Sequence, residues 1–272
     1  MTPLRKDDVS MDSRRLQILR SMDIDVWQRR ELARPAEVAL TEHRSAVVEV
    51  VAKQPEPTLA SVPLQRVSDV IKPPVNNIFP ENTLPSLETW TDVEQAVRNC
   101  TRCTLHTSRT QTVFGVGDRD AKWMVVGEAP GAEEDRKGEP FVGRAGQLLN
   151  AMLLAIGLQR EQVFIANILK CRPPNNRDPN PEEVNCCMPY LQRQIELVNP
   201  RLILCVGRIA AQNLLATDEP IGKLRGTVHH LGVQRRPVVV TYHPAYLLRS
   251  PNEKRKSWTD LQLAMQVFES TQ

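Results

Sequence analysis

Hydrophobic residues follow two alternating patterns in the last two thirds of the chain. Four short apolar runs, rich in β-branched residues, have the composition of buried strands: residues 123–126, 163–169, 201–206 and 237–241. Polar, Gly- or Pro-containing segments follow them, and apolar residues then recur at helical spacing, as in 143–157 and 181–198. Repeated strand–loop–helix units predict an α/β fold with three α/β/α layers and a central four-stranded, mostly parallel sheet.

Capping signals predict where several helices begin. The sequence Thr91-Asp92-Val93-Glu94 has the form of a capping box and is expected to open a helix through Arg98. Pro181 suits the first position of a helix that runs to Val198, with acidic residues in its first turn. The acidic cluster at 133–135 is expected in a loop after the first strand.

Glycine and proline divide the chain into two parts. All 12 glycines lie at Gly115 or later, whereas prolines crowd between residues 55 and 85. This predicts a non-globular N-terminal extension, 1–86, which ends in a Pro-rich linker, and a compact domain, 87–272. Residues 13–30 carry apolar side chains on one helical stripe. Such a short amphipathic helix docks on the main domain, enters the groove of a partner protein, or stays unstructured.

The chain has no apolar run long enough to span a membrane, and its first 30 residues are too charged for a signal peptide. We therefore expect a soluble, monomeric protein of the cytoplasm that does not bind membranes. Net charge is only +3, but residues 223–256 hold eight Lys or Arg against the single acid Glu253. This segment is either a solvated basic face or a rim that binds phosphate groups.

Six cysteines in a reducing compartment are unsuited to a disulfide framework. Four of them can form a four-thiolate metal site: Cys100, Cys103, Cys171 and either Cys186 or Cys187. Zinc and an iron–sulfur cluster both fit these ligands, and spacing alone does not separate them. Cys205 lies within a predicted strand and is expected in the core.

Four further residues are predicted at or just beyond the ends of strands, where α/β proteins bind ligands: Glu128, Phe141, Asn167 and His243. An amide can read donor and acceptor edges, an aromatic ring can stack, and a carboxylate can orient a water. Together they could hold a planar polar heterocycle. Each also has a plainer interpretation, since Asn commonly caps turns, His before Pro is often structural, and Phe is often core.

Three blocks carry a family resemblance: GEAPGAEEDRKGEPFVGRAGQLL, NILKCRPPNNRDPNPEE and TYHPAYLLRSP, preceded by the C-x-x-C pair. In this order they resemble the family 4 uracil-DNA glycosylases, the iron–sulfur members of the uracil-DNA glycosylase superfamily. The likeness spans about residues 90 to 268. The long extension departs from the compact members, and the adjacent Cys186 and Cys187 blur the fourth metal ligand.

The resemblance implies hydrolytic release of uracil from single- or double-stranded DNA, which initiates base-excision repair. It implies that Phe141 stacks on the base, that Asn167 pairs with its edge, and that His243 donates a hydrogen bond to the departing uracil. Glu128, with backbone groups at Ala129, would position the attacking water. The alternative is an inactive DNA-binding or polymerase-associated module of the same fold, and Glu128 in GEAPG disfavours a broader base specificity.

The resemblance also implies contacts to DNA and a metal centre. DNA would meet the Gly143 and Gly146 backbone, Tyr246, Leu247 and Leu248 as a wedge, and Arg249 at phosphates. The implied cofactor is a structural 4Fe-4S cluster, with zinc as the alternative. Its ligands would be Cys100, Cys103, Cys171 and Cys187.

Overall fold

A computed structural model of the chain describes residues 87–271. The predicted helix at 13–30 and the Pro-rich linker lie outside the described residues. Within those residues, no helix is long and apolar enough to cross a membrane.

The described part of the chain contains a six-stranded sheet in the order β1-β3-β2-β4-β6-β5. The strands are β1 (Val116–Gly117), β2 (Trp123–Gly127), β3 (Phe164–Asn167), β4 (Leu202–Val206), β5 (Val228–Leu231) and β6 (Arg236–Thr241). The four central strands are parallel, and β1 and β5 add an antiparallel edge on each side. The predicted parallel centre is confirmed, and the predicted strand number is two short.

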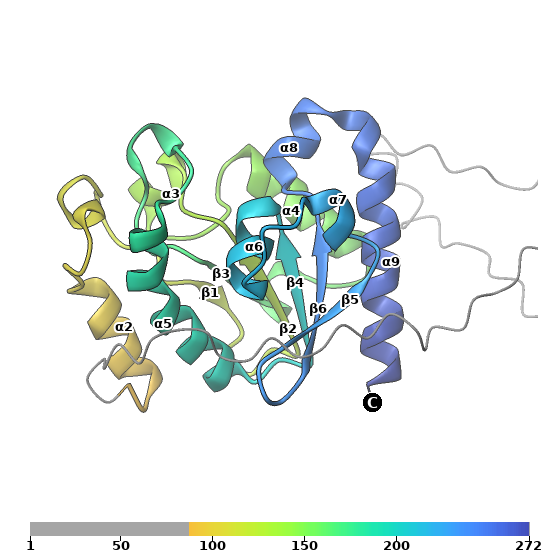
Figure 1. The fold of residues 1–272 in the computed structure, drawn as a ribbon, viewed down its shortest axis with the longest axis horizontal. Helices are drawn as coiled ribbons and strands as arrows, with labels where there is room; N and C mark the ends of the chain where they lie inside the picture. The colour runs from red at the N-terminus through yellow and green to blue at the C-terminus, as the bar shows by residue number, and fades with distance from the viewer. Residues whose placement is uncertain (1–86, 272) are drawn as a thin grey trace, which may run out of the picture. The chain divides into compact units, whose positions relative to one another are not determined.

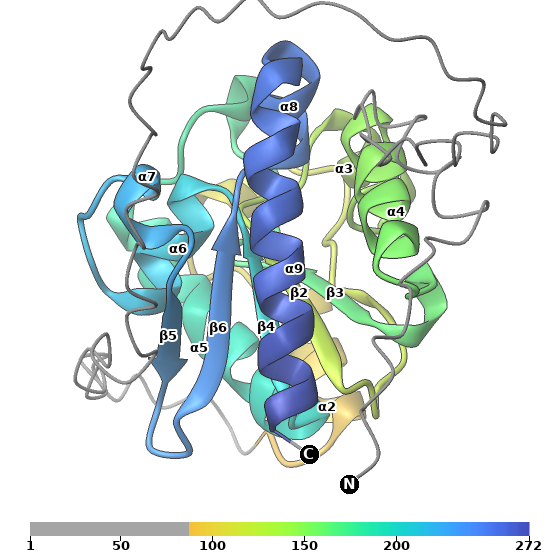
Figure 2. The same ribbon diagram turned by 90° about the vertical axis from the view of Figure 1, so that its right-hand side faces the viewer.

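The helices cover both faces of this sheet (Figures 1 and 2). They are α2 (Trp90–Arg98), α3 (Ala132–Lys137), α4 (Arg144–Ala155), α5 (Pro181–Val198), α6 (Arg208–Leu215), α7 (Ile221–Leu224), α8 (Pro244–Arg249) and α9 (Lys254–Ser270). Buried residues of α4, α8 and α9 pack on one face of the sheet and form one hydrophobic core with it. Buried residues of α5, α6 and α7 pack on the opposite face and form a second core. The three-layer α/β/α prediction is therefore confirmed.

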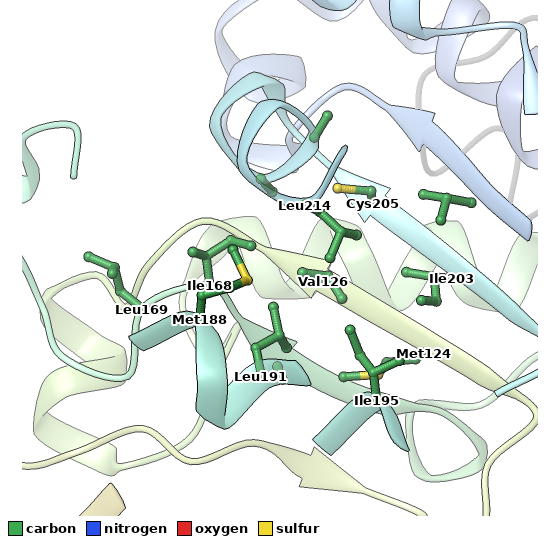
Figure 3. Packing of buried hydrophobic residues seen from close by; sticks show 14 of the residues in the cluster. Met124, Val126, Ile168, Leu169, Met188, Leu191, Ile195, Ile203, Cys205 and Leu214 are labelled. Carbon is green, nitrogen blue, oxygen red and sulfur yellow. The ribbon is translucent and has the colours of Figure 1, made fainter. Parts of the chain in front are cut away.

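Alternation along the strands builds the two cores, because successive side chains of a strand point to opposite faces. In β2, Met124 and Val126 face α5, whereas Trp123 and Val125 face α4 and α9. Figure 3 shows the first of these layers, where strand side chains meet Met188, Leu191 and Ile195 of α5 and Leu214 of α6. Cys205 is fully buried there, as its position within a strand predicted.

Two local predictions are wrong, and both errors concern helix starts. The capping box of α2 is Thr89 with Asp92, because the Asp92 carboxylate accepts the Thr89 N–H at 2.9 Å. The acidic cluster expected in a loop forms the first turn of α3, where carboxylates stabilise the positive helix end. Helix α5 begins and ends where the sequence predicted, at Pro181 and Val198.

The parallel strands place their carboxyl ends along one edge of the sheet. Gly127 of β2 pairs with Asn167 of β3, and Val206 of β4 pairs with Thr241 of β6. Helix α8 lies beyond the arrowheads of β4 and β6 (Figure 1). The segments that follow β2, β3 and β6 therefore emerge on the same side of the domain.

Candidate active site

A cavity of about 410 Å³ opens at this edge of the sheet. It is lined by all four residues of the predicted constellation, Glu128, Phe141, Asn167 and His243. Ala129, Tyr246 and Arg249 line it as well. The cavity thus gathers a carboxylate, an aromatic ring, an amide and an imidazole from segments far apart in the sequence.

Asn167, the last residue of β3, turns a hydrogen-bonding side chain into the cavity. It is only 2% exposed, and its Oδ1 has no hydrogen-bond partner within the described residues. An unpaired buried oxygen is costly unless a ligand supplies a donor. Lys170 fixes the backbone of Asn167, since its buried Nζ donates a hydrogen bond to the Asn167 carbonyl at 2.9 Å.

Phe141 lies against the cavity in a strained backbone conformation. Its φ is +54°, a region that bulky residues adopt only when their surroundings hold them there. The ring stacks on His243, with centroids 5.6 Å apart and an interplanar angle of 29°. Gly127 makes this arrangement possible, because a Cβ at that position would overlap both Asn167 Oδ1 and the Phe141 ring.

His243 caps the N-terminus of α8 and is oriented by it. Its Nδ1 accepts the backbone N–H of Ala245 at 3.1 Å. Burial, with a smaller contribution from the nearby Arg249, lowers the pKa of His243 to about 4, so the ring is neutral near pH 7. A neutral ring that accepts at Nδ1 carries its proton on Nε2. His243 therefore offers an uncharged Nε2–H donor.

Glu128 follows β2 directly and is partly buried. Burial raises its pKa to about 7, with Asp178 raising it and Arg208 opposing the rise. Asp178 and Arg208 pair with each other at 2.9 Å, and Asp178 also lines the cavity. A carboxyl with a pKa near neutrality is suited to accept a proton from water.

Sequence reasoning missed several residues of this cavity. Glu134 of α3 lines it, as do residues of the Pro-rich segment after β3, including Asn176, Arg177 and Asp178. Arg177 makes two hydrogen bonds to the Glu183 carboxylate, at 2.9 and 2.6 Å, which tie this segment to α5. The available signal was the position of this polar segment directly after a strand of the parallel sheet.

The structure shows other contacts for three residues that were expected to contact DNA. The N–H of Gly143 already donates to Glu134 Oε1 at 3.1 Å, so it is not free for a phosphate. Gly146 is buried because its backbone packs against the Phe141 carbonyl, where a Cβ would overlap. Leu247 is fully buried in the core, and the apolar side chain that α8 exposes is its neighbour Leu248, at 37%.

The predicted metal ligands come from three separate elements. Cys100 and Cys103 follow α2, Cys171 follows β3, and Cys187 lies in α5. Burial raises the pKa of the Cys103 thiol, and the charges of Cys171, Cys186 and Cys100 add to this. Burial likewise raises that of Cys187 to about 12, with Cys171 and Cys103 among its neighbours. The thiols therefore lie near one another.

The surroundings of these thiols suit a negatively charged thiolate site. Arg109 Nη1 donates to Cys171 Sγ at 3.0 Å, and buried Lys170 lies beside Cys171 and Cys187. Cys186 is turned differently, since its Sγ donates to the Arg102 carbonyl at 3.2 Å. In residues 87–271, no three His, Cys, Asp or Glu side chains are arranged to hold a metal ion. The thiols and the cations beside them are the right kinds of group for a thiolate-bound metal, although in residues 87–271 their side chains are not arranged as a complete set of metal ligands.

Comparison with known proteins identifies the family. The model of the uracil DNA glycosylase superfamily matches residues 114–262, more than half of the chain. The type-4 uracil-DNA glycosylase of Archaeoglobus fulgidus is 46% identical over 180 residues, which cover 64% of this chain and 90% of that protein. That of Pyrobaculum aerophilum is 44% identical (62% and 89%), and that of Thermotoga maritima 46% (60% and 86%). The chain belongs to the type-4 uracil-DNA glycosylases of this superfamily.

Proposed function

We propose the following roles for the cavity residues in uracil excision. The chain is a uracil-DNA glycosylase, which removes uracil from DNA and leaves an abasic site for base-excision repair. The observation that carries the proposed roles is the convergence of Glu128, Asn167 and His243 in one cavity. Uracil reaches such a cavity only after leaving the base stack, or from single-stranded DNA.

Asn167 selects the base and Phe141 supports it. The unpaired Oδ1 of Asn167 accepts the uracil N3–H, and the amide NH₂ of the same side chain donates to uracil O4. Cytosine presents an amino group in place of O4 and an acceptor in place of N3–H, so both contacts would be mismatched. The Phe141 ring provides a stacking surface for the flipped base.

His243 stabilises the leaving group. As the bond between the sugar C1′ and uracil N1 breaks, its electron pair departs with uracil, and negative charge develops on the uracil oxygens. The neutral Nε2–H of His243 donates a hydrogen bond to the O2 oxygen of uracil. A preorganised donor of this kind typically lowers a barrier by roughly 3 kcal/mol.

Glu128 completes the hydrolysis. Its carboxylate, with backbone groups at Ala129, orients a water that adds hydroxide to C1′ and gives its remaining proton to Glu128. The same negative charge opposes the positive charge that develops on the deoxyribose. The pKa of about 7 supports this role, because the group is ionised in part at neutral pH and can still accept a proton.

DNA is held at the rim of the cavity. Tyr246 and Arg249 of α8 line it, and the basic stretch 254–256 begins α9 immediately beyond. Arginine and lysine at such a rim neutralise phosphates, and this contribution weakens with salt. Of the two leucines, exposed Leu248 rather than buried Leu247 is available to fill the gap left by the base.

Cys100, Cys103, Cys171 and Cys187 are the ligands proposed for a 4Fe-4S cluster, with zinc as the alternative metal. Clustered thiols, the Arg109 donor and the family membership support this assignment. Cys187 is favoured over Cys186 because it shares a buried core with Cys171, whereas Cys186 bonds to a carbonyl. A thiolate-bound cluster would cross-link α2, the segment after β3 and α5.

A uracil-release assay tests the proposed function. We expect free uracil to be released from single- and double-stranded oligonucleotides that contain uracil, and none from matched oligonucleotides with thymine or cytosine. The alternative of an inactive DNA-binding or polymerase-associated module is not favoured, because the cavity carries the full set of reacting groups. That alternative would be supported by protein that retards the DNA in a gel and releases no uracil.

A further inference from the structure

We propose that Glu134 is a positioning residue that holds the Phe141 stacking surface at a fixed place relative to the segment carrying Glu128. The inference rests on the proposed function, because it assigns a role within the same cavity. Glu134 lines this cavity from α3 and was not among the residues that the sequence singled out.

The Glu134 carboxylate bonds to two separate segments. Its Oε2 accepts the N–H of Gly131 at 3.1 Å, as expected for the third residue of a helix that caps its own start. Its Oε1 accepts the N–H groups of Val142 and Gly143, at 2.9 and 3.1 Å. Since Gly143 is the N-cap residue of α4, one carboxylate caps two helices at once.

Each of these segments carries part of the site. Gly131 ends the short stretch that begins with Glu128 and Ala129, which faces the water and the sugar. Val142 and Gly143 follow Phe141 directly, the residue that stacks on the base. A carboxylate whose two oxygens bond to both stretches fixes the separation between them, because the distance between its oxygens is constant.

Phe141 needs such support. Its positive φ is unfavourable for a bulky residue, and its carbonyl is pressed against the backbone at Gly146. The hydrogen bonds that Val142 and Gly143 donate to Glu134 immobilise the two peptide units that follow Phe141. Without them we expect the chain at 140–143 to relax toward negative φ, which would swing the ring away from His243.

A double-mutant cycle tests this role against that of an ordinary stabilising cap. The variants are Glu134→Ala, Phe141→Leu and the double substitution, and the readouts are kcat and KM for uracil release together with the melting temperature. We expect Glu134→Ala to lower kcat/KM on the order of 100-fold, as misplacement of a substrate-orienting group does. The double variant should be about as impaired as Phe141→Leu alone, because Glu134 acts through Phe141.

Glu134→Gln covers the case in which the alanine variant does not fold. Its amide oxygen can still accept from Val142 and Gly143, but its NH₂ would face the Gly131 N–H and lose that bond. We expect an intermediate loss of kcat/KM, again absent in the Phe141→Leu background. Glu133→Gln is the matched control, since Glu133 precedes Glu134 directly, is 55% exposed and forms its ion pair with Arg136 on the surface of α3.

Three outcomes would overturn the inference. They are wild-type rates in Glu134→Ala, losses that multiply in the double variant, and a loss in Glu133→Gln equal to that in Glu134→Gln. All three require an active wild-type enzyme, so they are distinct from failure of the proposed function, in which wild type itself would release no uracil.

Discussion

His243 and Glu128 face the same cavity, and burial moves their pKa values in opposite directions. Burial disfavours the charged form of each group, so the pKa of His243 falls to about 4 and that of Glu128 rises to about 7. Near neutral pH the imidazole is an uncharged donor, while the carboxyl is close to its own titration point. The two groups are thus suited to the two different steps that we propose for them.

The pH dependence of excision should report Glu128. Because the proposed mechanism requires its carboxylate form to accept the water proton, kcat/KM should rise about tenfold per pH unit below pH 7 and become level above it. Glu128→Gln should be strongly impaired and lack this rise. A wild-type profile that is flat between pH 5 and 8 would remove Glu128 from the role of base.

Stability provides an independent check of the same group. A raised pKa in the folded state means that Glu128 favours folding below its unfolded value of 4.5, and that this contribution is lost as pH rises through about 7. Glu128→Gln should therefore melt like wild type at pH 4 and at a higher temperature than wild type at pH 8. Equal melting temperatures at both pH values would mean that the carboxyl is not destabilised by burial.

The proposed role of Asn167 is base selection, and Asn167→Asp tests it. The second carboxylate oxygen would face uracil O4 without a proton to share, so uracil release should fall roughly 100-fold or more. The same oxygen can accept the amino group of cytosine, so slow cytosine release is expected. Single-turnover assays on both oligonucleotides measure this, and unchanged uracil rates would place Asn167 outside the base pocket.

At the scale of elements, apolar runs and capping signals in the sequence were sufficient to predict the parallel strands at the centre of the sheet and the bounds of helix α5. Strand β1 was not predicted because a two-residue strand is too short to show an alternating pattern. Strand β5 was not predicted because His229 and His230 interrupt its apolar residues. Helix α3 was not predicted because its six residues are all polar or small and therefore show no apolar stripe. Short elements of this kind are fixed by tertiary contacts rather than by local sequence.

The sequence was enough to predict the cavity residues that lie at the ends of strands. It was not enough to predict those, such as Glu134, whose role depends on hydrogen bonds to the backbone. Asn167 and His243 could be placed from the sequence because parallel strands end together. The role of Glu134 could not, since it depends on a turn at Phe141 that no pattern predicts. Leu247 was misplaced because the segment after His243 is helix α8, whose periodicity turns that side chain into the core.

The segment between Cys171 and Cys187 joins the proposed metal site to the cavity, and its metal content can be measured. Protein purified without oxygen should be brown, with broad visible absorbance and about four irons per chain. Cys171→Ser should lose the colour and melt at a lower temperature, whereas Cys205→Ser should keep the colour. Colourless wild-type protein with one zinc per chain would contradict the iron–sulfur assignment.

At the scale of the whole molecule, the described domain contains both cores and every residue assigned a role. The chain covers 90% of the Archaeoglobus fulgidus protein, while about a third of this chain lies outside that alignment. Residues 13–30 remain a predicted amphipathic helix with a possible protein partner, and the monomeric state remains a prediction.

Deletion of residues 1–85 tests this division. Since the core and cavity lie within 87–271, we expect the truncated protein to fold and to release uracil within about threefold of the full-length rate. Circular dichroism and single-turnover excision would measure this. Insoluble or inactive truncated protein would show that the extension completes the catalytic domain.

The central claim is that His243 stabilises uracil as it leaves. The most direct measurement is single-turnover uracil release by wild type and His243→Ala, with circular dichroism to confirm folding. The account predicts a fall of about 100- to 1,000-fold, roughly 3 to 4 kcal/mol, and a smaller fall with 5-fluorouracil, a better leaving group. Equal rates for the two folded proteins would contradict it.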